Sequence, residues 1–279
     1  MPFAEANMKL SKLQLTNFRG FQSLELDLHP RVTLLGGVNG AGKSSILDAL
    51  AILLSQLVSS DSFFLKGQPP SVLIAYSKKE NVSFETLPKK EKDALRLSLL
   101  KEQGFLCGYC MCRIDDQPLT TGIEHWHSQA KYPEEALNYK NLHAVCSGNS
   151  GQPIAMLHCD KSKAGQSDPK AKPDLHFQPS DGFHPIERMI RYSVDGLIDS
   201  DDSIMREDLK MLNLNVAKLK NLRSVVIFTV AETLNSRIGT RTRSQIEKYL
   251  QHWNQRSNEQ LPEFYGVAVY FLKKKLAKF

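Results

Sequence analysis

The stretch Cys107-Gly108-Tyr109-Cys110 decides the fold expected for the centre of this chain, because two thiolates at this spacing can grip one zinc ion from a tight turn. A structural zinc site needs two more ligands, and Cys146 and Cys159 are the natural candidates. Zinc would then pin the ends of a segment too small to have its own core. Cys112 is left over and could compete as a ligand. The alternative is that all of these are buried apolar thiols.

The wider composition favours reduced cysteines and a polyanionic partner. All five cysteines lie between Cys107 and Cys159, and the N-terminus has no basic segment followed by an apolar run and a cleavage site. The longest apolar stretch, Ile46 to Val58, is too short and too polar to span a bilayer. We therefore expect a cytoplasmic protein without membrane association, whose clustered cysteines indicate metal. The net charge of +6 mildly favours a partner such as nucleic acid.

Three regions follow from changes in the pattern along the chain. Residues 1–58 read as strand, strand, Gly-rich loop and helix, residues 63–180 hold an N-terminal arm and a core at 105–165, and residues 181–279 are mainly helical. Helical spacing of apolar residues predicts a helix over 89–103, and Val194-Asp195-Gly196 predicts the turn of a hairpin over 188–199. Further helices are predicted at about 216–236 and 244–253, and a last one ends in a run of lysines.

The order of short motifs around the cysteines resembles the HNH, or ββα-metal, endonuclease family. Gly122-Ile123-Glu124-His125-Trp126-His127 lies between the cysteine pairs, and Tyr139-Lys140-Asn141-Leu142 and Cys159-Asp160-Lys161-Ser162-Lys163 follow. The family pattern is C-x2-C, an acidic-His pair on a strand, Asn-Leu, and Cys-(Asn/His/Asp)-x-x-Lys opening a helix. The resemblance implies a metal-dependent endonuclease that cuts DNA. The fold class expected is then α+β, with a zinc-pinned HNH core and a helical C-terminal region behind a short α/β P-loop fragment.

The resemblance assigns chemical roles to single side chains. A histidine of near-neutral pKa can take the proton of an attacking water, and His125 matches the family's base. His127, on the same strand face, is the alternative base. Glu124 and Asp160 match the two metal ligands, and carboxylates suit a hard ion such as Mg2+ or Mn2+. Asp160 could instead be only a helix N-cap.

Two further residues complete the expected nuclease site. Asn141 matches the asparagine that holds the two-stranded part in shape, and Lys163 lies one helical turn past the metal ligand, where it could meet a phosphate.

Stretches within 63–279 also resemble the nuclease partner of Septu-type and retron-associated antiphage systems, which implies an ABC-type partner ATPase. These stretches are 64–70, 99–107, 146–149, 158–160 and 212–215.

A second motif lies near the N-terminus. Gly37-Val38-Asn39-Gly40-Ala41-Gly42-Lys43-Ser44 fits G-x-x-x-x-G-K-[ST], follows a predicted strand and opens a predicted helix. In such a P-loop, backbone N–H groups cradle phosphates, the lysine reaches them and the serine holds Mg2+. The residues expected to contact nucleotide are Gly37, Gly40, Gly42, Lys43 and Ser44.

With Asn17-Phe18-Arg19-Gly20-Phe21 ahead of it, this segment resembles the N-terminus of ABC-type DNA-repair and overcoming-lysogenization-defect ATPases. We find no apolar strand ending in Asp-Glu and no Leu-Ser-Gly-Gly signature, so we expect a truncated remnant that does not hydrolyse ATP. ATP binding, or completion by a partner chain, stays open. Two alternatives to the nuclease are a non-catalytic zinc module that docks DNA or an ATPase, and a P-loop ATPase with an adaptor C-terminus.

Overall fold

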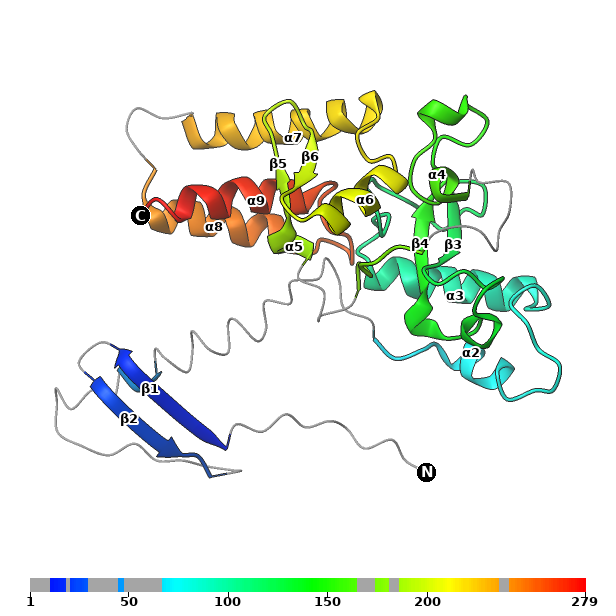
Figure 1. Ribbon diagram of the computed structural model, residues 1–279, viewed down its shortest axis with the longest axis horizontal. Helices are drawn as coiled ribbons and strands as arrows, with labels where there is room; N and C mark the ends of the chain where they lie inside the picture. Colours follow the sequence, from blue (N-terminus) through cyan, green and yellow to red (C-terminus); the bar gives the residue numbers. More distant parts are fainter. Residues whose placement is uncertain are drawn as a thin grey trace. The chain divides into compact units, whose positions relative to one another are not determined.

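The computed structural model describes residues 11–18, 21–29, 45–47, 67–164, 174–180, 186–235 and 241–279. The chain divides into two compact units, Met1–Ser60 and Asp61–Phe279, which are described separately (Figure 1). In the described ranges, no helix combines the length and the apolar character needed to cross a membrane. The α+β composition expected from the sequence is confirmed, since several helices accompany small two-stranded sheets.

The first unit is built on an antiparallel hairpin. Strand β1 (Lys12–Phe18) pairs with β2 (Phe21–Asp27). Leu13 and Leu15 on β1 are buried because they alternate with polar residues and share one face of the hairpin. Residues 45–47 are helical, and Ile46 packs on the same two leucines. The start of the predicted helix is therefore anchored on the hairpin.

The predicted P-loop residues themselves, which are Gly37, Gly40, Gly42, Lys43 and Ser44, lie outside the described residues. Residues 45–47, which follow Ser44 in the sequence, are helical. A helix after the loop is the context that a P-loop requires.

The second unit consists of small sheets surrounded by helices. Its helices and strands are α2 (Ser71–Tyr76), α3 (Lys89–Glu102), β3 (Thr121–His125), η1 (Pro133–Glu135), η2 (Tyr139–Asn141), β4 (Leu142–Cys146), η3 (Ile154–Met156), α4 (Asp160–Ala164), α5 (Ile186–Met189), β5 (Ile190–Tyr192), β6 (Ile198–Ser200), α6 (Ser203–Met211), α7 (Ala217–Asn235), α8 (Arg243–Asn254) and α9 (Tyr265–Leu276). The predicted helix at 89–103, the hairpin at 188–199 and the three C-terminal helices are thereby confirmed.

The pair β3–β4 lies on α3 in the core of this unit. The strands are antiparallel, with Glu124 opposite His143. Leu95 and Leu99 of α3 are fully buried in the same apolar cluster as β4. Gln103, just after α3, fixes the contact: its amide nitrogen donates to Ala144 O at 2.7 Å, and its amide oxygen accepts from Ala144 N at 2.8 Å. A buried amide bonded on both sides acts as an extra rung of the sheet.

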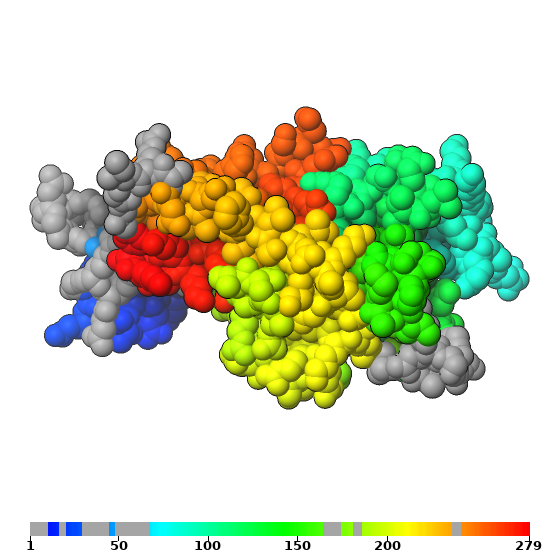
Figure 2. Space-filling view, turned by 90° about the horizontal axis from the view of Figure 1, so that it is seen from above, coloured from blue at the N-terminus to red at the C-terminus, as the bar shows by residue number. Residues whose placement is uncertain are grey.

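The C-terminal helices close over the central loop. In the backbone, Leu261 N donates to Gly104 O at 3.0 Å and Phe264 N donates to Met111 O at 3.1 Å. Figure 2 shows the segment before α9 lying against the chain around residue 110. The short helices α2, α5 and α6 were not predicted. For α6 a signal was present, since its N-cap Asp202 accepts a hydrogen bond from Met205 N.

Replacing Gly196 by alanine is expected to destabilise this unit more than replacing Gly151 by alanine. The two glycines have φ of 81° and 86°, so an alanine at either site costs about 1–2 kcal/mol in backbone strain. Only at Gly196 would the new Cβ meet another atom, the Lys220 carbonyl oxygen of α7 at 2.0 Å. Urea unfolding followed by circular dichroism measures both losses. Equal losses would show that the β5–β6 turn does not press on α7.

Candidate functional site

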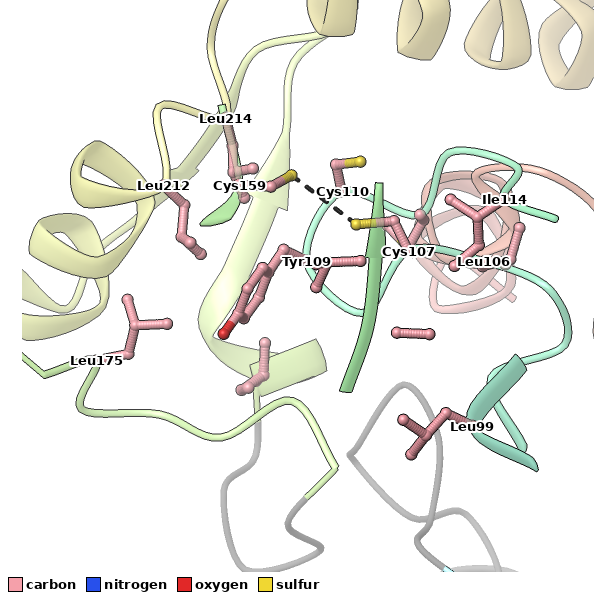
Figure 3. Packing of buried hydrophobic residues seen from close by; sticks show 14 of the residues in the cluster. Leu99, Leu106, Cys107, Tyr109, Cys110, Ile114, Cys159, Leu175, Leu212 and Leu214 are labelled. Atoms are coloured by element: carbon pink, nitrogen blue, oxygen red, sulfur yellow. Dashed lines mark hydrogen bonds between the residues drawn. The ribbon is translucent and has the colours of Figure 1, made fainter. Parts of the chain in front are cut away.

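Four cysteine sulfurs gather at one point of the second unit. The sulfurs of Cys107, Cys110, Cys146 and Cys159 all lie within 4.8 Å of one another. Figure 3 shows those of Cys107, Cys110 and Cys159 turned toward a common centre. Within the described residues, no other group of three or more His, Cys, Asp or Glu side chains is placed to share a metal ion. Four thiolates at this separation form the donor set of a tetrahedral zinc site.

Three separate elements bring the sulfurs together. Cys107 and Cys110 belong to the loop after α3, Cys146 ends β4, and Cys159 precedes α4. Cys159 has a positive φ of 56° and its N–H donates to Leu212 O at 2.8 Å, so its position is fixed by the chain after α6. The cluster therefore joins the sheet, the loop and the helical part of the unit.

The sulfurs interact electrically even without an ion. Burial opposes ionisation of Cys107, but hydrogen bonds from Cys110, Cys146 and Cys159 outweigh it and lower its pKa. The pKa of Cys159 is raised, first by burial and then by its bond with Cys107. Ionising more than one of these buried thiols requires a compensating positive charge, which a metal cation would supply.

One neighbour of the cluster was missed by the sequence analysis. The Nδ1 atom of His158 lies 3.2 Å from the sulfur of Cys159 and 3.9 Å from that of Cys146. Its ring is buried, which lowers its pKa. Adjacency to Cys159 in the sequence was the available signal. Cys112, which the sequence left as a possible competing ligand, lies outside the four-sulfur group.

The carboxylate of Glu124 is held in a buried ion pair. Lys163 Nζ donates to Glu124 Oε1 at 2.7 Å and also to the backbone oxygens of His125 and Trp126. The Lys163 side chain is only 5% exposed and that of Glu124 12%. Burial raises the pKa of Glu124 to about 8, against the effect of Lys163 and with a further rise from Asp160. These three residues form a polar group between β3 and α4.

The two candidate histidines have different surroundings. His125 Nε2 lies 2.9 Å from Ala136 O, the ring is buried, and burial lowers its pKa. His127 Nδ1 lies 2.9 Å from Glu135 Oε2, and its ring stacks between Trp126 and Tyr132. The structure thus places His125 in a packed position and gives His127 a carboxylate partner.

Asn141 ties the turn after β3 to the start of β4. Its side-chain oxygen accepts from His127 N at 2.7 Å, and its amide nitrogen donates to His127 O at 3.0 Å and to Glu135 O at 3.3 Å. The residue is buried. This three-bonded amide fixes the path of the chain between the strands of the sheet.

Comparison with known proteins locates the similarity in the N-terminal part. The model of one family, described as AAA ATPase domain, matches residues 8–105. The "DNA replication and repair protein RecF" of Arthrobacter sp. (strain FB24) is 47% identical over 70 residues, which are 24% of this chain and 18% of that protein. The RecF of Lactococcus lactis subsp. cremoris (strain MG1363) is 39% identical over 62 residues, 21% of this chain and 17% of the relative.

A match over more residues, but over a smaller share of the relative, is to the "DNA double-strand break repair Rad50 ATPase" of Methanosarcina acetivorans. It is 35% identical over 153 residues, which are 50% of this chain and 13% of that protein. The chain therefore spans less than a fifth of the length of these relatives.

These matches correct the functional prediction. The chain was expected to be an HNH endonuclease of an antiphage subfamily with an ATPase remnant that does not hydrolyse ATP, and both statements are contradicted, because the similarity is to ATPases. The HNH core expected from the sequence is contradicted for the same reason. The roles given to Glu124, His125, Asn141, Asp160 and Lys163 depended on the order of short motifs. The structure accounts for most of these side chains by packing, ion pairing and backbone clamping.

Substituting methionine for Lys163 is expected to lower the free energy of unfolding by about 3–5 kcal/mol above pH 8, where the carboxylate of Glu124 loses its partner inside the protein. Below pH 8 the loss should be smaller, since Glu124 binds a proton and leaves no unpaired charge. Because Lys163 lowers the pKa of Glu124, that pKa is higher in the variant, and the loss keeps growing above pH 8.

The matched control is Lys161→Met on the same helix. Its ion pair with Asp160 is 3.4 Å long and the lysine side chain is 44% exposed, so the expected change is below about 1 kcal/mol. Urea unfolding at several pH values compares the two. Similar, pH-independent losses would contradict a buried ion pair at Lys163.

Proposed function

We propose that this protein is a P-loop ATPase that works on DNA, with ATP and Mg2+ bound by the N-terminal unit and the second unit serving as a zinc-pinned adaptor. The match of residues 8–105 to an AAA ATPase domain carries the proposal. The P-loop pattern at 37–44 supports it, and so does the helical turn that follows directly and packs through Ile46 on β1.

The nucleotide site follows from the pattern. Backbone N–H groups at Gly37, Gly40 and Gly42 would surround the phosphates, Lys43 would neutralise them, and Ser44 would hold Mg2+. An acidic residue after an apolar strand is missing from the sequence pattern, so we infer that hydrolysis is completed by a second chain. The DNA in the proposal comes from the relatives, whose names describe replication and repair of DNA.

Lys43→Ala is expected to weaken binding of Mg-ATP to the full chain by about tenfold or more, because it removes a charged contact to the phosphates. Equilibrium titration with a fluorescent ATP analogue measures the loss. Lys248→Ala, at an exposed position of α8, is the matched control and should bind as the unaltered chain does. Unchanged binding in the Lys43 variant would overturn the proposal.

Hydrolysis adds a second readout to the same variants. Phosphate release per chain should rise with protein concentration if a second chain completes the site, and it should rise further when double-stranded DNA is added. A rate per chain that is flat in concentration would contradict completion by a second chain, while leaving nucleotide binding in place.

We also propose that Cys107, Cys110, Cys146 and Cys159 bind about one structural zinc per chain. Replacing Cys107 by serine should remove the ion and loosen the second unit, because the three remaining cysteines cannot complete a four-ligand zinc site. Cys112→Ser is the control and should retain zinc. Elemental analysis together with thermal unfolding measures both effects, and well-folded protein without zinc would sink the assignment.

A further inference from the structure

An open hollow of 530 Å³ lies where the end of α8 meets the loop that follows Cys112. Its polar wall has two arginines, a histidine, three side-chain amides and one hydroxyl, and none of the described residues that line it carries a carboxylate. Figure 2 shows the two chain segments side by side. Such a wall offers positive charge and many hydrogen-bond donors.

The two guanidinium groups are held in place by uncharged partners. Arg256 donates to the backbone oxygens of Lys101 and Glu102, at the end of α3. Arg113 donates to the backbone oxygens of Gly104 and Phe105 at 3.0 and 3.2 Å. Carbonyl oxygens fix the geometry of a guanidinium without cancelling its net charge, so the hollow keeps two oriented positive groups.

Two carboxylates lie near the hollow, and each has a partner of its own. Glu259 forms an ion pair with Lys101 at 3.2 Å, and Glu263 accepts a hydrogen bond from the backbone N–H of Arg113 at 2.9 Å. Burial lowers the pKa of Arg113, and Glu263 opposes that shift. Since an arginine stays charged at any physiological pH, the wall remains cationic.

The rim of the hollow is a strained two-residue turn. Ser257 and Gln260 exchange both backbone hydrogen bonds, at 2.9 and 3.0 Å. Asn258 and Glu259 between them have φ of 50° and 65°. This is the conformation of a type I′ turn, in which glycine is the usual second residue. A glutamate there is unfavourable, and strain that the fold maintains is found most often at ligand sites.

We propose that this hollow binds the phosphate group of a nucleotide, either within a DNA strand or in a free nucleotide. Arginine forks and side-chain amides are the groups that recognise phosphate oxygens, and the volume lies in the range of about 300–1,000 Å³ of small-molecule sites. The site belongs to the second unit and is distinct in sequence from the P-loop. It deepens the proposed role with DNA by assigning a contact, and it stands whether or not ATP is hydrolysed.

The site is tested with the full-length double variant Lys43→Ala/Arg256→Gln. The first substitution removes nucleotide binding at the P-loop, and the second alters the hollow. Three probes are titrated: a fluorescent single-stranded oligodeoxynucleotide, AMP and inorganic phosphate. Binding of the favoured probe should weaken by about tenfold, because a charged hydrogen bond is lost. For the oligonucleotide, the slope of the logarithm of the binding constant against the logarithm of the salt concentration should decrease in magnitude by about one. The control is Arg243→Gln at the start of α8, whose 65% exposed side chain pairs with Glu247. This variant should leave binding unchanged.

The probes separate the two sources of phosphate. Binding of the oligonucleotide without AMP assigns a strand phosphate, and binding of AMP with competition by inorganic phosphate assigns a free nucleotide. If Arg256→Gln unfolds, the double variant Gln255→Ala/Gln260→Ala removes two amides of the wall while leaving the arginine bonds intact, and it should weaken binding several-fold. The proposal is overturned if no probe binds the Lys43→Ala chain, or if a folded wall variant binds as the control does. Neither result bears on ATP binding at the P-loop.

Discussion

The meeting of four cysteine sulfurs is the constraint on which the second unit depends. Cys107 and Cys159 are 52 residues apart in sequence, yet their sulfurs are 3.9 Å apart. The sheet at this point has only two strands, and α4 is only five residues long. Neither element is stable by itself in water, because short hairpins and single helical turns do not recover their ordering entropy. The cysteine cluster links β4 to the start of α4, Gln103 ties β4 to the end of α3, and Lys163 joins α4 to β3.

The sequence predicted those parts of the fold that rest on local patterns. The apolar spacing of Leu95, Leu99 and Leu100 marked α3, and a glycine that needs positive φ marked the β5–β6 turn. The gathering of the four cysteines was also predicted, from the C-x2-C pair and from the clustering of all cysteines in one segment. Gln103 was not, because a polar residue at a helix end looks exposed until its strand partner is known. The same limit hid the hollow, whose two arginines come from distant parts of the chain.

The functional error has a related cause. The ordered motifs Glu-His, Asn-Leu and Cys-Asp-x-x-Lys resemble those of a nuclease. Side chains in these motifs also have structural roles in this fold. Lys163 satisfies a buried carboxylate and two carbonyls, and Asn141 clamps a turn. The longer pattern at the N-terminus, a P-loop motif at 37–44 behind a predicted strand, was interpreted as a remnant. The similarity to ATPases favours an ATPase for that part, although no acidic residue was found after an apolar strand.

The backbone bonds from Leu261 to Gly104 and from Phe264 to Met111 also bear on how the chain is made. The loop that carries the first two cysteines is synthesised long before the residues that pack on it. One of these, Glu263, lies 150 positions after Arg113, whose backbone N–H it binds. Until Leu261 and Phe264 have been synthesised, this loop lacks these contacts and its apolar neighbours are exposed. Nascent chains therefore pass through an aggregation-prone interval, and a product that stops before Leu261 never leaves it.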